Sequence, residues 1–486
     1  MHVTIKVGPI KSRIIETLDL KNSHALRHAL SYENRDAFMQ RRAGNKHAPD
    51  RYYLITDKRQ EFRTGLLHRV KQNLDLLGIS YTLDDERVFG EPDFALLLNS
   101  KMTFRDYQND AIRAAITERN GMIRMATGGG KTAVMAGIIA ELERKTVVLV
   151  HRVDLMKQTL DVLRGLLAYP EIVGQVGAGV YEPNLITVCT VQTICYALGL
   201  RMDIDESDDE DLKGSRLHEA EIRQMLDEAK VVILDEAHHA PAKMISEVLM
   251  LTAHASWTIG LSATDFRDDG SDLLIEAAIG PRIHDTSISD LVDLGFLVPA
   301  KVRMFPMKVP SNPCFSSNWQ TLYKHYYVDN DAFHTQVTED VAGLYELGRH
   351  TLVLVSRIEH GHKLAKRFKD RGIDAVFLSG NDVHSRRESV LNSVRSGKLR
   401  CLIGTSIADE GLDLPILDAL VLAGGGTSRV ATYQRIGRTL RPFDGKENAL
   451  VIDYRCRDTP KMSEKAGSRA QIYRTEKQFD FVEVRK

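Results

Sequence analysis

The sequence predicts an α/β protein with two tandem parallel-sheet domains preceded by a small N-terminal α+β domain. Short apolar β-rich runs alternate with helix-like segments, the alternation occurs as two successive series, and roughly the first hundred residues follow a different pattern. Alternation of strands and helices builds parallel sheets, because each crossover between parallel strands needs a helix. A chain of 486 residues is long enough for several domains with their own cores. We therefore expect domains at residues 1–100, 101–298 and 299–460, followed by a C-terminal tail at 461–486.

The N-terminal segment combines strand-like and helix-like patterns. Residues 2–7 alternate apolar and polar side chains, RYYLIT at 51–56 is strand-like, and 62–77 carries apolar residues at helical spacing. Arg63, Arg69 and Lys71 lie off that apolar stripe. Residues 1–72 hold 6 Lys and 9 Arg against 4 Asp and 3 Glu, which leaves a local excess of eight positive charges in a chain of net charge −1. This excess is either an ordinary solvated surface or an electrostatic footprint for nucleic-acid phosphates, and the second reading makes the three cations candidate DNA contacts.

Two series of β-rich runs follow the N-terminal segment. Ligands of open parallel sheets bind at the carboxyl ends of the strands, so polar residues at the ends of these runs are the candidate site. An acidic run at 203–211, in which seven of nine residues are Asp or Glu, is expected to be a solvated loop without a catalytic role. The predicted strands are 146–151, 186–190, 231–235 and 257–261 in the first series, and 351–356, 374–378, 400–404, 418–422 and 448–453 in the second.

Composition narrows the class of protein. With 43% apolar and 27% charged residues, the chain is typical of a soluble globular protein, and no stretch approaches the length of a membrane span. The five cysteines are scattered without a C-x-x-C pair, which predicts neither a disulfide framework nor a zinc or iron–sulfur site. The N-terminus lacks the apolar core of a signal peptide. We expect a cytoplasmic protein without a membrane partner.

A glycine-rich loop is the first candidate for chemistry. MATGGGKT at 125–132 follows the apolar run Met122–Met125 and precedes a helix-like segment starting at Lys131. A loop of this kind at a helix N-terminus directs backbone N–H groups at phosphate oxygens, with Lys131 on the β- and γ-phosphates and Thr132 on Mg²⁺. Met125 stands where the strict pattern has glycine, and a glycine turn without a ligand is the alternative. The loop residues that would cradle ATP are Thr127, Gly128, Gly129 and Gly130.

A pair of carboxylates strengthens the phosphate-loop reading. Asp235 and Glu236 follow the apolar run VVIL and begin the sequence DEAH, about a hundred residues after the loop. A carboxylate at the end of a parallel strand lies at the same sheet edge as the loop. Asp235 is then placed to hold Mg²⁺ and Glu236 to orient the attacking water. Capping of the next helix is the alternative role for this pair.

These residues resemble the motifs of helicase superfamily 2, and the resemblance runs in the family's order from about residue 104 to 442. FRDYQNDAI (104–112) is similar to the adenine-reading motif, which implies contacts to ATP by Arg105 and Gln108. LVHRVDLMKQ (149–158) and TVQT (190–193) are similar to two strand-contacting motifs, which implies nucleic-acid contacts by Arg152, Thr190 and Gln192. The resemblance implies two RecA-like domains and an ATP-driven motor that uses Mg²⁺.

The second series carries the remaining motifs. The family's pattern implies that Arg357 and Thr405 contact nucleic acid and that Asp413 contacts ATP. LSATDFRDDG (261–270) is similar to motif III, LVLVSRIEHG (352–361) to motif IV, LSGNDVHSRR (378–387) to motif IVa, IGTSIADEGLDLP (403–415) to motif V and YQRIGRTLRP (433–442) to motif VI.

Motif VI can also be read physically. Gln434, Arg438 and Arg441 recur at i, i+4 and i+7, which places them on one face of a helix. A solvated basic face is the alternative to a catalytic one. The resemblance implies a catalytic role for all three residues, with the two arginines reaching the γ-phosphate and neutralising charge in the transition state.

The motif III form, SISDLVDLGFLVPAKV (287–302) and the ending GRTLRP are most similar to the XPB-like group, which includes the UvsW-type phage recombination helicases. This resemblance implies an ATP-dependent DNA helicase or translocase that unwinds or branch-migrates forked, branched or duplex DNA in recombination or repair. A monomer in the cytoplasm, or in the host cytoplasm if the chain is phage-encoded, is expected. Two alternatives stay open at this point: an RNA helicase or restriction translocase, and a phosphate-loop switch protein with slow or no hydrolysis.

Overall fold

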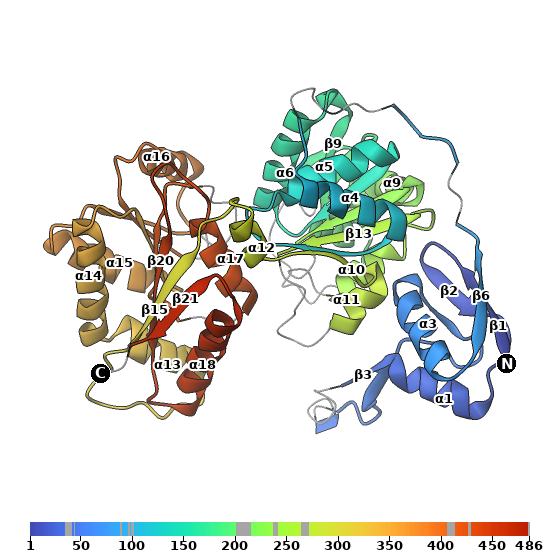
Figure 1. The fold of residues 1–486 in the computed structure, drawn as a ribbon, viewed down its shortest axis with the longest axis horizontal. Coiled ribbons are helices and arrows are strands. Elements are labelled where there is room, and N and C mark those ends of the chain that lie inside the picture. Colours follow the sequence, from blue (N-terminus) through green and yellow to red (C-terminus); the bar gives the residue numbers. More distant parts are fainter. Residues whose placement is uncertain are drawn as a thin grey trace. The chain divides into compact units, whose positions relative to one another are not determined.

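The computed structural model describes residues 1–34, 41–42, 44–87, 90–95, 98, 102–200, 215–236, 242–263, 272–405, 414–425 and 429–484. The chain divides into two compact units (Figure 1). The first comprises residues 1–125 and 130–285, and the second comprises residues 126–129 and 286–486. The acidic run 203–211 lies outside the described residues.

The N-terminal part of the first unit is a small α+β domain. Its sheet has the order β5-β2-β1-β6, in which β1 pairs antiparallel with β2 and parallel with β6. Its core contains Val3, Ile5, Phe62, Val70 and Leu74. The elements are β1 (His2–Val7), β2 (Lys11–Ile14), α1 (Leu20–Ala29), β3 (Ser31–Glu33), β4 (Arg51–Tyr53), β5 (Glu61–Arg63), the 3₁₀ turn η1 (Thr64–Leu66), α3 (Leu67–Leu76) and β6 (Ser80–Asp85).

The helix predicted at 62–77 begins later than its apolar periodicity suggests. Residues 61–63 form strand β5, where Phe62 pairs with Ser12 of β2, and α3 starts only at Leu67. The first apolar residues of the pattern are nevertheless buried, because strand and helix contribute to the same core. Residues 61–63 form a strand because they pair with β2, although the spacing of their apolar side chains is typical of a helix.

The rest of the first unit is an α/β domain around an eight-stranded sheet of order β10-β9-β11-β8-β12-β13-β7-β14. The pairs joining β9, β11, β8, β12, β13 and β7 are parallel. The strands are β7 (Asn120–Met125), β8 (Thr146–Val150), β9 (Val173–Gly177), β10 (Val180–Glu182), β11 (Ile186–Thr190), β12 (Val231–Asp235), β13 (Trp257–Ser262) and β14 (Arg282–Thr286). The helices and 3₁₀ turns are α4 (Asp106–Glu118), α5 (Lys131–Leu142), α6 (Val153–Leu166), η2 (Pro170–Ile172), α7 (Val191–Ala197), η3 (Ser215–His218), α9 (Glu219–Glu228), α10 (Ala242–Leu249) and α11 (Asp272–Ile279).

The N-terminal domain packs on helix α11 of this α/β domain. Leu273 and Ala277 of α11 join the N-terminal core. A Cβ added at Gly65 would lie 2.4 Å from the carbonyl oxygen of Glu276, so only glycine permits this close approach of the two backbones. The N-terminal domain is therefore held by apolar packing against the first α/β domain.

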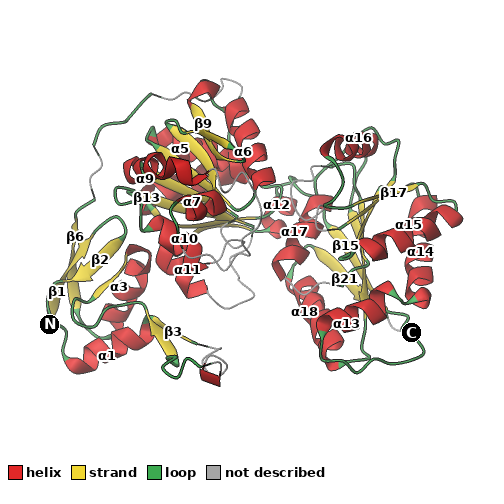
Figure 2. Ribbon diagram, turned by 180° about the vertical axis from the view of Figure 1, so that it is seen from behind, coloured by secondary structure: helices red, strands yellow, loops and turns green. Residues whose placement is uncertain are grey.

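The second unit is an α/β domain around a seven-stranded sheet of order β17-β18-β16-β19-β20-β15-β21, with every pair parallel (Figure 2). The strands are β15 (Ala300–Pro306), β16 (Thr351–Leu354), β17 (Ala375–Leu378), β18 (Cys401–Gly404), β19 (Ala419–Leu422), β20 (Ala449–Arg455) and β21 (Phe479–Glu483). The helices are α12 (Ile288–Asp293), α13 (Trp319–Tyr323), the π-helix η4 (Lys324–Val328), α14 (Asp331–Glu346), α15 (Ile358–Asp370), α16 (His384–Arg395), α17 (Arg429–Thr439) and α18 (Pro460–Thr475).

The expected C-terminal tail is part of this second domain. Strand β21 pairs with β15 and completes the sheet. Helix α18 precedes this strand in the sequence. Its Arg469 donates to both carboxylate oxygens of Asp453, at 2.8 and 3.0 Å, and its Tyr473 donates to the same carboxylate at 2.8 Å. Arg469 and Asp453 are both buried, and this pairing raises the pKa of Arg469 despite its burial. Removing the segment would leave Asp453 as a buried charge without its counter-ion.

The boundary between the α/β domains also differs from the expected 298/299. Residues after 285 belong to the second unit. There, Gln478 donates to Asp293 at 2.6 Å, and the amide of Val298 donates to the carbonyl of Leu440 at 2.8 Å. These contacts join 286–298 to the domain that follows.

Candidate functional site

The glycine-rich loop has the backbone geometry that only glycine adopts readily. Gly128 and Gly130 have φ angles of +91° and +85°, and Gly130 is the N-cap of α5. Lys131 and Thr132 form the first turn of that helix, whose leading N–H groups lack intrahelical acceptors and favour an anion. The conformation therefore suits the predicted phosphate cradle.

The predicted adenine-reading residues lie beside this loop. The backbone amide of Arg105 donates to the side chain of Gln108 at 3.0 Å at the start of α4. A Cβ added at Gly130 would lie 2.4 Å from Gln108 Nε2, so the Gln108 side chain packs against the end of the loop. Gln108 is buried, and its position couples the start of α4 to the candidate phosphate cradle.

The two carboxylates of the DEAH sequence meet the loop lysine. Asp235 ends β12, and Glu236 follows with a φ of +48°, a left-handed conformation that is costly for a side chain with a Cβ. Glu236 forms an ion pair with Lys131, 105 residues away in sequence. Burial first, and then the neighbouring Glu236 carboxylate, raise the pKa of Asp235 to about 6 against the opposing effect of Lys131. The rest of the sequence, Ala237 and His238, lies outside the described residues.

The motif VI residues lie on and after helix α17. Arg438 lies half-buried on the last turn of α17. The helix ends at Thr439, so Arg441 lies beyond it. The three residues predicted on one helix face therefore do not share one helix. Burial lowers the pKa of Arg441. The backbone of Gln434 lies in α17, but its side chain and the whole of Asp413 lie outside the described residues.

Sequence reasoning missed a lysine that anchors motif VI. Lys446 donates to the carbonyl oxygens of Arg441 at 2.7 Å, Leu417 at 2.7 Å and Pro415 at 3.1 Å. One ammonium group thus links the end of motif V and the residues just after it to the last arginine of motif VI. A lysine near the motif was visible in the sequence, but no periodicity indicated its three backbone acceptors.

The predicted nucleic-acid contacts of the first α/β domain differ in accessibility. Arg152 is exposed at the N-cap of α6. Thr190 is buried, and its hydroxyl caps α7 by accepting from the amide of Thr193. Gln192 is half-buried on the first turn of α7. Capping is the visible role of the Thr190 hydroxyl, whereas Arg152 lies where a ligand can reach it.

In the second domain, Arg357 and Thr405 follow the neighbouring strands β16 and β18. Arg357 is the N-cap of α15 and donates to Gln320 at 2.7 Å. Thr405 is buried at the end of β18. Because the two strands are parallel, both residues lie at the carboxyl edge of the sheet, where ligands of such sheets bind.

Two of the three N-terminal cations have partners inside the first unit. Arg69 binds the carboxylate of Glu276 through two nitrogens, and Arg63 donates to the carbonyl of Ser246 at 3.1 Å. His68 also lies 2.6 Å from Glu276. Although burial opposes ionisation, these neighbours hold the pKa of Glu276 below its usual value. Arg63 and Arg69 therefore contact the first α/β domain, and the expected contact of these cations with DNA stays a prediction. Lys71 lies half-buried on α3, and the described residues provide it with no ion pair.

The described residues contain neither a metal-binding cluster nor a membrane-spanning helix. Their acidic, histidine and cysteine side chains include no group of three or more placed to hold a metal ion. Their helices include none that is long and apolar enough to cross a membrane.

Comparisons with known proteins match both α/β domains. The family model described as "Type III restriction enzyme, res subunit" matches residues 101–267, and "Helicase conserved C-terminal domain" matches 336–442. The protein named "Putative helicase 22" of Sulfolobus islandicus filamentous virus is 27% identical over 372 residues, which cover 72% of this chain and 63% of that protein. The DNA 3'-5' translocase XPB2 of Sulfurisphaera tokodaii is 25% identical over 392 residues, which cover 74% and 82%.

The solved structure of UvsW from bacteriophage T4 matches over 99% of both chains, with 17% identity and a TM-score of 0.46. The chain spans only 57% to 63% of the length of the viral relative and of two haloarchaeal relatives named Rad25. The fold and the site together define a phosphate-loop protein with tandem parallel-sheet domains, which are RecA-like. Within that class, the chain is similar to helicases of superfamily 2 in the XPB-like group.

Proposed function

We propose that this protein is an ATP-driven motor that moves on, unwinds or branch-migrates forked or branched DNA. The observation that carries the proposal is the meeting of Lys131, Asp235 and Glu236 beside a glycine loop with left-handed φ angles. A phosphate clamp, a metal-binding carboxylate and a water-orienting carboxylate are the groups that phosphoryl transfer to water requires.

The residues present fit ATP and Mg²⁺. The helix start at Lys131 and the turn at Gly128–Gly130 suit the phosphates, while the Thr132 hydroxyl and the Asp235 carboxylate are oxygen ligands of the kind that Mg²⁺ prefers. Bound Mg²⁺ would neutralise charge on the phosphates. Lys131 is paired with Glu236 in this structure. A polyphosphate would offer Lys131 a second anion, which would leave Glu236 available to accept a proton from water.

The motif VI arginines would complete the chemistry. Arg438 and Arg441 are guanidinium groups that stay charged, and charge stabilisation by such groups acts mainly in the transition state. In this proposal, ATP hydrolysis is coupled to a conformational change of the protein. Repeated motion on a nucleic-acid track would produce translocation.

DNA is the proposed track. Arg152 and Arg357 lie at the starts of helices that follow parallel strands, and in this proposal they contact backbone phosphates. The relative from Sulfurisphaera tokodaii is named a DNA 3'-5' translocase, which supports DNA over RNA. We propose that the protein acts as a monomer in DNA recombination or repair, in the cytoplasm or in the host cytoplasm if phage-encoded.

The test is ATP hydrolysis measured without nucleic acid, with single-stranded DNA, with forked DNA and with RNA of the same sequence. We expect DNA to stimulate the rate, and we expect both Lys131→Ala and Glu236→Gln to abolish it. The variant Glu236→Gln should still bind ATP, because Lys131 remains. Lys369→Ala, which removes an exposed lysine on α15, is the charge-matched control. Hydrolysis by Glu236→Gln at the wild-type rate would disprove the assignment of the base, and stimulation by RNA alone would replace DNA as the track.

A further inference from the structure

An exposed phenylalanine in the second domain has no structural role among its described neighbours. Phe315 is 85% exposed, the highest value for any aromatic side chain in the described part of the chain. It lies in the loop between β15 and α13. An exposed aromatic ring has a face on which a nucleic-acid base can stack, so the surroundings of Phe315 decide whether it is a candidate for contact with a ligand.

The loop that carries Phe315 is held in place on both sides. The amide of Cys314 donates to the hydroxyl of Tyr326 at 3.2 Å, and Lys461 of α18 donates to the carbonyl of Ser317 at 3.1 Å. His325 contacts the carbonyl of Asn312 at 2.7 Å. The ring is therefore presented by a fixed backbone, which lowers the entropic cost of binding a ligand.

Cations and a second aromatic ring lie beside this loop. The ammonium of Lys465 lies 4.1 Å from the centroid of the Trp319 ring, and both views show α13 beside α18 (Figures 1 and 2). The first residues of α18 contain Lys461 and Lys465 against one acidic residue, Glu464. Aromatic rings flanked by cations are the pattern with which proteins bind single-stranded nucleic acid.

Side-chain contacts connect this surface to Arg357. Trp319 and Tyr323 are neighbours at 6.0 Å between ring centroids, and the Arg357 guanidinium lies 5.5 Å from the centroid of the Tyr323 ring. Gln320, between those two aromatic residues in sequence, accepts a hydrogen bond from Arg357. The surface thus continues from a residue already assigned to the nucleic-acid track.

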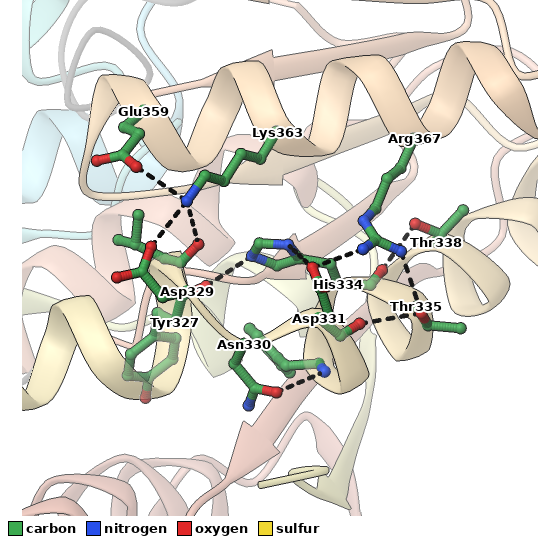
Figure 3. Close-up of polar contacts among 12 residues, drawn as sticks. Tyr327, Asp329, Asn330, Asp331, His334, Thr335, Thr338, Glu359, Lys363 and Arg367 are labelled. Atoms are coloured by element: carbon green, nitrogen blue, oxygen red, sulfur yellow. Dashed lines mark hydrogen bonds and ion pairs between the residues drawn. The ribbon is translucent and has the colours of Figure 1, made fainter. Parts of the chain in front are cut away.

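Helix α15, which begins after Arg357, is also clamped to the segment that follows α13. Lys363 forms ion pairs with Asp329 at 2.8 Å and with Glu359 at 2.9 Å, and Arg367 forms one with Asp331 at 2.6 Å. Figure 3 shows these side chains directed toward one another. These pairs hold α15 against the end of η4 and the start of α14. Arg357 and the α13 segment are therefore positioned as one piece.

We infer that Phe315 is a stacking platform for an unpaired base of single-stranded nucleic acid, with Lys461 and Lys465 contacting the adjacent phosphates. The inference rests on the proposed function and extends its track from Arg357 across α13 and α18. Stacking on an aromatic face tolerates any base, so the platform would grip the strand without reading its sequence.

The test compares the affinity of a dye-labelled oligothymidylate for three variants over a range of salt concentrations. Phe315→Ala should weaken binding about tenfold without changing the salt dependence, because stacking releases no counterions. Lys461→Gln should lower the slope of log affinity against log salt by about 0.7, the value for one phosphate contact on a single strand. Leu347→Ala, which trims a side chain that is 75% exposed at the end of α14, is the matched control and should bind as wild type.

A second measurement reports stacking directly. An oligonucleotide containing 2-aminopurine should lose fluorescence on binding to the wild type and to Phe315→Trp, but keep it on binding to Phe315→Ala. If Phe315→Ala matches Leu347→Ala in affinity and in fluorescence while DNA still stimulates wild-type ATP hydrolysis, the platform is wrong and the proposed function stands. If no nucleic acid binds or stimulates the wild type, the proposed function itself fails.

Discussion

Replacing Lys446 by methionine tests how motif VI is held in position. Methionine keeps most of the apolar stem but removes the ammonium that donates to the carbonyls of Pro415, Leu417 and Arg441. A hydrogen bond to a charged group contributes about 1.5–3 kcal/mol, and three bonds that share one ammonium share one desolvation cost. We therefore expect a loss of about 3 kcal/mol in the stability of the second domain.

That loss should be visible both in unfolding and in catalysis. For a domain of this size, each kcal/mol lowers the melting temperature by about 2–4 °C, so Lys446→Met should melt about 6–12 °C lower than wild type. The kcat for ATP hydrolysis should fall by about tenfold or more, because small displacements of a positioned catalytic group are costly. Differential scanning fluorimetry and steady-state kinetics measure the two effects.

Two controls separate anchoring from general destabilisation. Lys446→Arg keeps a charged donor and should retain most of the stability and kcat. Lys477→Met removes an exposed lysine of the same domain and should behave as wild type. A Lys446→Met protein that melts and turns over like Lys477→Met would refute the reasoning.

Three further predictions follow from the structure. Arg438→Ala and Arg441→Ala should each lower kcat by about 10³-fold while changing the Kd for ATP little, since the arginines act in the transition state. Steady-state kinetics measures kcat and calorimetry measures the Kd for ATP. A variant that loses ATP binding but keeps the wild-type kcat would contradict this role. Burial lowers the pKa of His360 to about 3, so the ring stays neutral in the folded state while it becomes protonated in the unfolded chain below about pH 6.5. The free energy of unfolding should therefore be about 2 kcal/mol lower at pH 5 than at neutral pH because of this group. The free energy measured by urea unfolding should depend less on pH in His360→Gln than in the wild type. A double-mutant cycle on Arg69 and Glu276, measured by thermal unfolding, should give a coupling free energy between the two side chains of at most about 1 kcal/mol, because the Arg69 side chain is 42% exposed. A coupling of zero would mean that this ion pair does not help to dock the N-terminal domain.

The docking of the N-terminal domain also changes how its role in DNA binding can be examined. Deletion of residues 1–90 would expose Leu273 and Ala277 of α11, which belong to the N-terminal core. A deleted protein that binds DNA poorly would therefore not separate grip from stability. Lys71→Gln is the sharper variant, because the described residues give this lysine no ion pair. Its DNA affinity should become less salt-dependent if the positive excess of the domain contacts phosphates.

Many strands of both sheets could be predicted because their burial leaves a local signal. The runs 186–190 and 231–235 coincide with β11 and β12, whose side chains are nearly all buried and therefore apolar without interruption. Strand β21 gave no such signal, since FDFVE alternates exposed and buried residues at the edge of the sheet. The helix expected at 62–77 failed for a related reason: Phe62 pairs with a strand fifty residues earlier, and the local pattern contains no trace of that partner.

The sequence by itself determined the class of this protein and the groups that carry its proposed chemistry. Lys131, Asp235 and Glu236 were recognisable because a phosphate loop and a strand-end carboxylate pair are short segments whose spacing is set by local backbone geometry. Only the tertiary structure decided which groups are already occupied and which are available. Arg69 has its partner 207 residues away, and Lys446 binds backbone carbonyls. Tyr326 and Lys461 bond to Cys314 and Ser317, the residues on either side of the exposed Phe315. Such pairings depend on the path of the whole chain, so no local pattern of residues encodes them.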